Sequence, residues 1–103
     1  MERLCFFIEL RPGAEAEYDR RHAEIWPEMA EAVATAGYTN YTLFRRDRTV
    51  VGYAECVPDV ATVLAAIGAT EVGERWSKSF VDIIERMTDA DGDLLRADEV
   101  WHL

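Results

Sequence analysis

The sequence predicts an α+β domain of ferredoxin-like βαββαβ topology, a four-stranded antiparallel sheet with helices on one face, formed by residues 1–103 as a single domain. Strand-like and helix-like hydrophobic patterns alternate along the chain in that order. Its 103 residues suffice for one modest core. Apolar residues occupy both faces of several strands, so a bare sheet face would be an oversized apolar patch. We therefore expect a homodimer, as in a dimeric α+β barrel.

The first third of the chain indicates a strand followed by a helical region. Residues 3–10 form a dense apolar run with β-compatible residues, which predicts a strand buried on both faces. Residues 14–36 have helical character, and Gly37 is the expected stop. Pro27 lies inside this region and is expected to kink the helix or divide it in two, because proline lacks an N–H donor and crowds the preceding turn.

A β-hairpin is predicted next. Residues 40–46 alternate as a strand with Tyr41, Leu43 and Arg45 on one side, and residues 50–57 return as its partner.

The remaining chain predicts two helices and a closing strand. A short helix is expected from Pro58 to about Gly68, and a second from residues 70–87, where apolar positions recur at helical spacing. Residues 88–93 form an acidic loop that contains glycine, and residues 99–103 are expected to close the sheet.

The composition favours a neutral small-molecule ligand. A formal net charge of −9 argues against nucleic acid and anionic membrane surfaces as partners. The apolar stretches are too short to span a bilayer, and the first residues lack the pattern of a signal peptide, so we expect a cytoplasmic location. The only cysteines, Cys5 and Cys56, lie in strand-like segments and are expected to be buried free thiols.

No cofactor or metal site is predicted. His22 and His102 are the only imidazoles, and no cysteine or carboxylate spacing completes a metal site around them. A glycine-rich phosphate loop and a Ser-His-Asp grouping are also missing from the sequence.

One stretch carries the strongest chemical pattern. If residues 18–29 are helical, Tyr18, His22, Ile25 and Met29 share a face, with Trp26 on the same half. Histidine exchanges protons near neutral pH, and aromatic faces with a few polar tips are typical of sugar-binding clefts. Packing within the core or an interface is the alternative interpretation of such a histidine.

The pattern Tyr-x-x-x-His-x-x-x-Trp-Pro-Glu at residues 18–28, followed by Gly-x-x-Asn-Tyr at residues 37–41, resembles the L-rhamnose mutarotase family. Residues 71–76 and the terminus at residues 99–103 extend the similarity over essentially the whole chain. The helix motif is the specific part of this resemblance, and the later segments support it.

The resemblance implies a dimeric α+β fold and an isomerase that interconverts the α and β anomers of a 6-deoxy sugar without a cofactor. It implies that His22 is the proton donor and that Tyr18 and Tyr41 contact the sugar. The family's tryptophan pair corresponds to Trp76 followed by Ser77. Serine removes a stacking wall and adds a hydroxyl, which leaves the identity of the sugar open.

The chemistry of anomer exchange suits these residues. The ring oxygen gains a proton while the anomeric hydroxyl loses one, the ring opens to the aldehyde, and it closes on the other face. One acid–base group near neutral pKa is sufficient. His22 is expected to donate to the ring oxygen, whereas the residues do not identify the base, since Glu24 falls on the far face of the helix.

Two other function classes stay open at this point. The first is a cofactor-free monooxygenase or cyclase on the same dimeric fold, because fold does not determine function. The second is a non-catalytic ligand-binding module.

Overall fold

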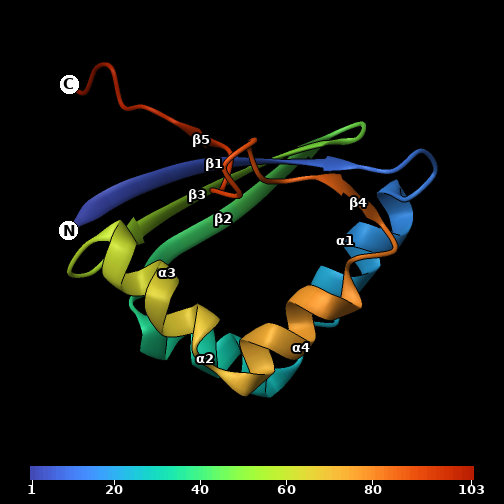
Figure 1. The fold of residues 1–103 in the computed structure, drawn as a ribbon, viewed down its shortest axis with the longest axis horizontal. Helices are drawn as coiled ribbons and strands as arrows, with labels where there is room; N and C mark the ends of the chain where they lie inside the picture. The colour runs from blue at the N-terminus through green and yellow to red at the C-terminus, as the bar shows by residue number, and fades with distance from the viewer.

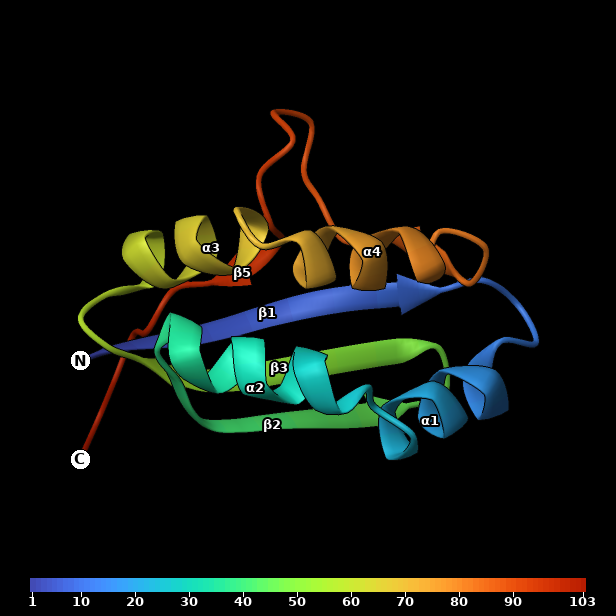
Figure 2. The ribbon, with the colours of Figure 1, turned by 90° about the horizontal axis from the view of Figure 1, so that it is seen from below.

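The computed structural model describes residues 1–103 and has one antiparallel sheet with all helices on one of its faces (Figures 1 and 2). The strand order is β2-β3-β1-β4, and a further short strand, β5, also pairs with β1. This is the predicted ferredoxin-like order. The strands are β1 (Glu2–Leu10), β2 (Tyr38–Arg46), β3 (Thr49–Cys56), β4 (Ile84–Arg86) and β5 (Arg96–Ala97), and the helices are α1 (Glu15–Ala23), α2 (Pro27–Ala36), α3 (Val60–Gly68) and α4 (Glu71–Ser79).

The predicted division of the first helical region occurs immediately before Pro27. This proline is the first residue of α2, where its missing N–H costs no intrahelical bond. Gly37 ends α2 in the left-handed conformation at φ 111°. Because the chain leaves helical geometry between α1 and α2, Ile25 does not share the face of Tyr18, and it is 37% exposed.

The second helical region is shorter than the sequence pattern predicts. Thr70 caps α4 by accepting a hydrogen bond from the Gly73 N–H, and the helix ends at Ser79 rather than near residue 87. Ile84 then lies opposite Leu10 at the edge of β1. The apolar spacing of residues 84–86 also suits a helix, but these residues form a strand because they pair with free backbone N–H and C=O groups at the edge of β1.

The predicted strand at residues 99–103 is wrong. Pairing with β1 occurs at β5, where Ala97 lies opposite Cys5. In this register residue 100 would lie opposite Glu2, the first residue of β1, so the strand offers almost no partner beyond that point. Arg3 instead holds the tail through Glu99 and His102, each at 2.7 Å, and Trp101 is 74% exposed.

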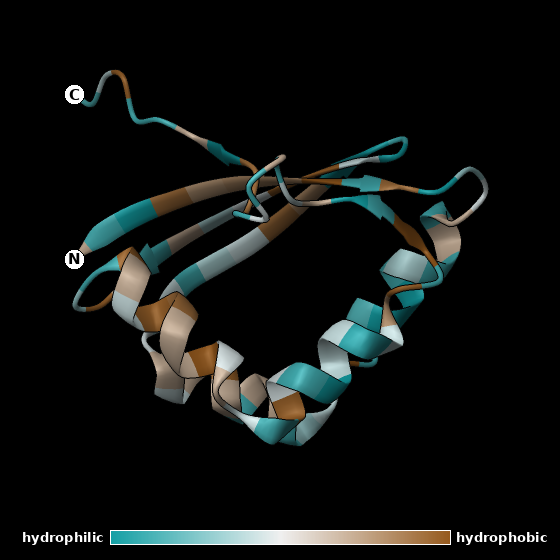
Figure 3. Cartoon of the chain, in the orientation of Figure 1, coloured by the Kyte–Doolittle hydropathy of each residue, from teal (hydrophilic) through white to brown (hydrophobic).

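Contrary to the prediction of a strand buried on both faces, only the inner face of β1 is buried. Its inner face carries four core residues, and the outer-face residues Cys5 and Phe7 are half-buried. Both cysteines are free thiols as predicted, although only Cys56 is fully buried. Figure 3 shows hydrophobic residues along β1 and α3, whereas α1 and α4 are largely hydrophilic. The inner-face core residues of β1 are Leu4, Phe6, Ile8 and Leu10.

None of the four helices is long and apolar enough to cross a membrane.

Replacing Gly37 by alanine is expected to lower the free energy of unfolding by about 2–5 kcal/mol, because the new side chain meets both backbone strain and a steric clash. The added Cβ would lie 2.2 Å from the Val57 carbonyl oxygen, on backbone with positive φ. Equilibrium urea denaturation measures the change. Gly68→Ala is the matched control, since a Cβ there meets no atom within 4 Å. Equal urea midpoints for the two variants would contradict the prediction.

Candidate functional site

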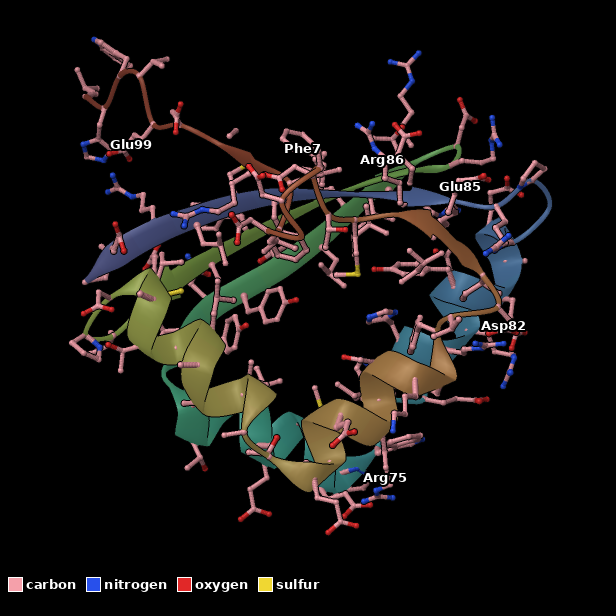
Figure 4. All side chains as sticks on the ribbon, in the orientation of Figure 1. Phe7, Arg75, Asp82, Glu85, Arg86 and Glu99 are labelled. Carbon is pink, nitrogen blue, oxygen red and sulfur yellow. The ribbon has the colours of Figure 1, made fainter.

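A cavity of about 450 Å³ lies between the inner face of the sheet and the helices, and Figure 4 shows side chains pointing into a hollow there. Most of its lining is hydrophobic. The polar side chains in the lining, apart from the tyrosines, are His22, Glu74 and Ser77. All five site residues predicted from the sequence line this one cavity: Tyr18, His22, Tyr41, Trp76 and Ser77.

Tyr18 and His22 are presented by α1 on successive turns of one face. Tyr18 is 3% exposed, and the two ring centroids lie 4.4 Å apart. Contacts on both flanks of this face hold α1 beside the cavity. Asp19 accepts two hydrogen bonds from Arg45 of β2, at 2.6 and 2.7 Å. Arg21 donates to the Ser79 carbonyl oxygen at 2.6 Å, which ties α1 to the end of α4.

The hydrogen bond of His22 identifies its neutral tautomer. Its Nδ1 lies 3.2 Å from the Tyr18 carbonyl oxygen. A carbonyl oxygen only accepts, so Nδ1 carries the proton and Nε2 holds a lone pair. Burial lowers the pKa of His22, and the Tyr18 carbonyl and the Asp19 charge offset this only in part. The imidazole is therefore a neutral base at neutral pH, and its Nε2 makes no hydrogen bond to the protein.

Trp76 forms an aromatic wall beside the imidazole. Its ring lies 5.5 Å from that of His22, nearly perpendicular, and 4.7 Å from Phe80. Behind it, outside the cavity lining, Trp26 packs edge-on at 5.0 Å and lies under the Arg75 guanidinium. Trp26 thus packs where Pro27 starts a new helix and supports the wall from outside.

A β-bulge in β2 brings Tyr38 and Tyr41 to the same side. Thr39 pairs with Glu55 and Thr42 with Tyr53, so β2 has one residue more than β3 in this interval. The two tyrosine rings stack at 4.9 Å with an interplanar angle of 17°. Strict alternation places residues 38 and 41 on opposite faces, so the sequence pattern could not reveal Tyr38 as a cavity residue.

The three phenols of the cavity are neutral hydroxyl groups. Burial raises the pKa of Tyr18 and Tyr41 well above the ordinary value and that of Tyr38 to about 12. They are therefore poor bases but remain hydrogen-bond donors and acceptors. The cavity therefore offers the hydroxyl groups of a ligand directed hydrogen-bond partners around an apolar centre.

Glu74 is a lining residue that the sequence analysis missed. It precedes Ser77 by one helical turn, and that i,i+3 spacing on α4 was a signal available in the sequence. The sequence analysis also did not identify a cluster of three aspartates with metal-ligand spacing. Asp89, Asp91 and Asp93 bring carboxylate oxygens within 4.8 Å of one another on an exposed loop outside the cavity lining.

A family model described as L-rhamnose mutarotase matches residues 3–103. The chain belongs to the L-rhamnose mutarotase family. The L-rhamnose mutarotase of Opitutus terrae is 36% identical over 105 residues, covering 100% of this chain and 99% of that protein. The one from Bacteroides thetaiotaomicron is 31% identical, with 100% and 99% covered. A crystal structure of L-rhamnose mutarotase from Formosa agariphila shares the fold, with a TM-score of 0.79 at 22% identity over 100% of this chain and 99% of that one.

Membership in the L-rhamnose mutarotase family confirms the resemblance predicted from the sequence. It also confirms the predicted class, a sugar mutarotase and hence an isomerase acting on carbohydrates. The match therefore favours this class over a monooxygenase or cyclase and over a non-catalytic module.

We expect His22 to titrate with a pKa below its ordinary value of 6.5, because burial disfavours the imidazolium. The contribution of His22 to the free energy of unfolding should accordingly be fully present above the unfolded-state pKa and be lost as the pH falls through the folded-state pKa. Nitrogen-15 NMR of the imidazole reports the midpoint together with the tautomer.

Asp19→Asn serves as the companion variant for this titration. The Asp19 charge raises the pKa of His22, so its removal should lower the midpoint further. A midpoint above 6.5 in the unaltered protein, or a proton on Nε2 in the neutral form, would contradict the assignment.

Proposed function

We propose that this chain interconverts the α and β anomers of L-rhamnose or a related 6-deoxy pyranose in the cavity, without a cofactor. The observation that carries the proposal is the His22 imidazole, whose Nδ1 is anchored to the Tyr18 carbonyl and whose Nε2 is left free in a cavity suited to a sugar. The names of the relatives support rhamnose as the sugar.

One nitrogen is able to carry the whole proton transfer. Nε2 of neutral His22 accepts the proton of the anomeric hydroxyl, and the electrons of that O–H bond form the aldehyde as the C1–O5 bond breaks. The departing ring oxygen then takes the proton from the imidazolium. Both oxygens are bonded to C1, so a single positioned group reaches both, and no separate base is required. The donation to the ring oxygen that the family resemblance implies is the second half of this transfer.

The other site residues are proposed to hold the sugar. The Trp76 face packs against the apolar side of the ring, where the methyl group of a 6-deoxy sugar lies. The hydroxyls of Tyr18, Tyr41 and Ser77 provide hydrogen bonds to sugar hydroxyls. After ring opening, rotation about C1–C2 and closure on the other face yield the second anomer, with the proton transfers reversed.

A homodimer with sheet face against sheet face is also part of this proposal. The face of the sheet away from the helices carries a contiguous apolar group, the outer-face patch, in which Phe44 is 62% exposed. Figure 4 shows Phe7 on that side, and the terminal tail also lies there. A two-fold dimer buries such a self-complementary surface. The outer-face patch comprises Cys5, Phe7, Phe44, Val51 and Tyr53. A cytoplasmic location stays a prediction from the sequence.

We expect the protein to accelerate anomer exchange of free L-rhamnose, as measured by magnetisation-transfer NMR between the anomeric protons. His22→Ala should reduce turnover by roughly 10²–10⁴-fold, the usual worth of a positioned acid–base group. Sugar binding should weaken much less, because the stacking and hydroxyl contacts remain.

His102→Ala is the matched control for this experiment, since His102 lies in the exposed tail outside the cavity lining. It should leave turnover unchanged. Near-normal exchange in a folded His22→Ala protein would remove His22 from the mechanism. An exchange rate equal to that in buffer, for L-rhamnose and its common stereoisomers, would refute the proposed function.

Light scattering at micromolar concentration should give about twice the chain mass of 11.7 kDa. Phe44→Glu places a charge in the outer-face patch and should yield monomers, because an unpaired charge is costly to bury. Val81→Glu changes a residue of similar exposure, 64%, outside the patch and should stay dimeric. A monomeric unaltered protein would contradict the proposed homodimer.

A further inference from the structure

Glu74 is the one charged side chain in the lining of the cavity. It lies on α4 one turn before Ser77, and the i,i+3 spacing makes the two side chains neighbours on the helix surface. The proton transfer through His22 does not use this carboxylate. Its side chain is 63% exposed, which places it where the cavity meets solvent rather than at the buried end near Tyr18.

The Glu74 carboxylate is held on one side and free on the other. Its Oε1 lies 2.9 Å from Nζ of Lys78, one turn further along α4. This i,i+4 ion pair is exposed and contributes little to stability, but it restricts the side chain. The second oxygen, Oε2, makes no hydrogen bond to the protein and is available to a ligand.

The Glu74 carboxylate supplies a charged hydrogen-bond acceptor, which the other side chains of the lining do not. A pyranose carries several hydroxyl donors, and the neighbouring polar groups of the cavity are mainly hydroxyls that both donate and accept. An ionised carboxylate only accepts, and its hydrogen bonds are shorter and about twice as strong as those between neutral groups. A sugar without the matching hydroxyl loses this hydrogen bond and is therefore bound more weakly.

We propose that Glu74 is a substrate-binding residue that accepts hydrogen bonds from sugar hydroxyls at the mouth of the cavity, beside a hydroxyl contact made by Ser77. The inference rests on the proposed function, because it takes a free pyranose as the ligand. It assigns discrimination among hydroxylated sugars to the Glu74–Ser77 side of α4, while Trp76 of the same helix supplies the stacking face.

The test begins with Glu74→Gln, which keeps the size of the side chain and removes its charge. We expect KM for L-rhamnose to rise about tenfold, the equivalent of one charge-assisted hydrogen bond. The kcat should stay within about twofold, since bond breaking occurs at His22. Glu71→Gln is the matched control, because it makes the same change in the first turn of α4 outside the cavity lining, and its KM should not change.

Monodeoxy analogues of L-rhamnose distinguish a direct contact from a structural effect. The analogue that lacks the contacted hydroxyl should bind the unaltered protein more weakly and show little further loss in Glu74→Gln, as in a double-mutant cycle. An unchanged KM, or an equal loss for every analogue, would overturn the inference.

Calorimetric binding separates this inference from the proposed function. If the unaltered protein binds L-rhamnose without accelerating anomer exchange, the proposed function fails, and Glu74 is still tested through the dissociation constant. Weaker binding by Glu74→Gln then supports the contact, and equal binding overturns it. Absence of any sugar binding by the unaltered protein overturns both.

Discussion

The inner face of β1 is the constraint on which the rest of the structure depends. Leu4, Phe6 and Ile8 belong to the buried core and also line the cavity. The same apolar row therefore provides the packing surface for the helices and the floor of the site. Because protein cores are close-packed and stiff, a floor made of core residues holds its shape without a ligand. Gly52 on the neighbouring strand lies directly over Phe6, where a Cβ would meet the ring at 2.2 Å, so this floor has no room for a larger residue.

The orientation of α1 decides whether the histidine is chemically useful. The helix is short. Besides the packing of Tyr18 in the core, two guanidinium contacts hold it, Arg45 with Asp19 and Arg21 with Asp82. Such partly exposed pairs contribute only about 0–1 kcal/mol each to stability. Their importance is geometric, since they hold α1 on both flanks of the face that carries Tyr18 and His22. The carbonyl of Tyr18 then selects the tautomer of His22 within the helix itself.

Charge is distributed so that the reacting centre is nearly neutral. The chain has a formal net charge of −9, yet most acidic side chains lie outside the cavity. Burial disfavours the imidazolium of His22 and the phenolates of the tyrosines alike. A neutral sugar suits this surrounding, because it brings hydroxyls and C–H faces but no charge that would have to be desolvated.

The sequence by itself determined the ferredoxin-like class, the division at Pro27 and the stop at Gly37, and its family motif grouped the site residues, but it misplaced the closing strand. These follow from local rules of periodicity, backbone conformation and a specific motif, which act over a few residues. Only the tertiary structure decided that residues 84–86 pair with β1, that the tail lies free of the sheet, and that a bulge turns Tyr38 beside Tyr41. For residues 84–86 and the tail, the outcome depends on which backbone groups of β1 are still unpaired. For Tyr38 it depends on the register between β2 and β3, and short-range patterns carry no information about either.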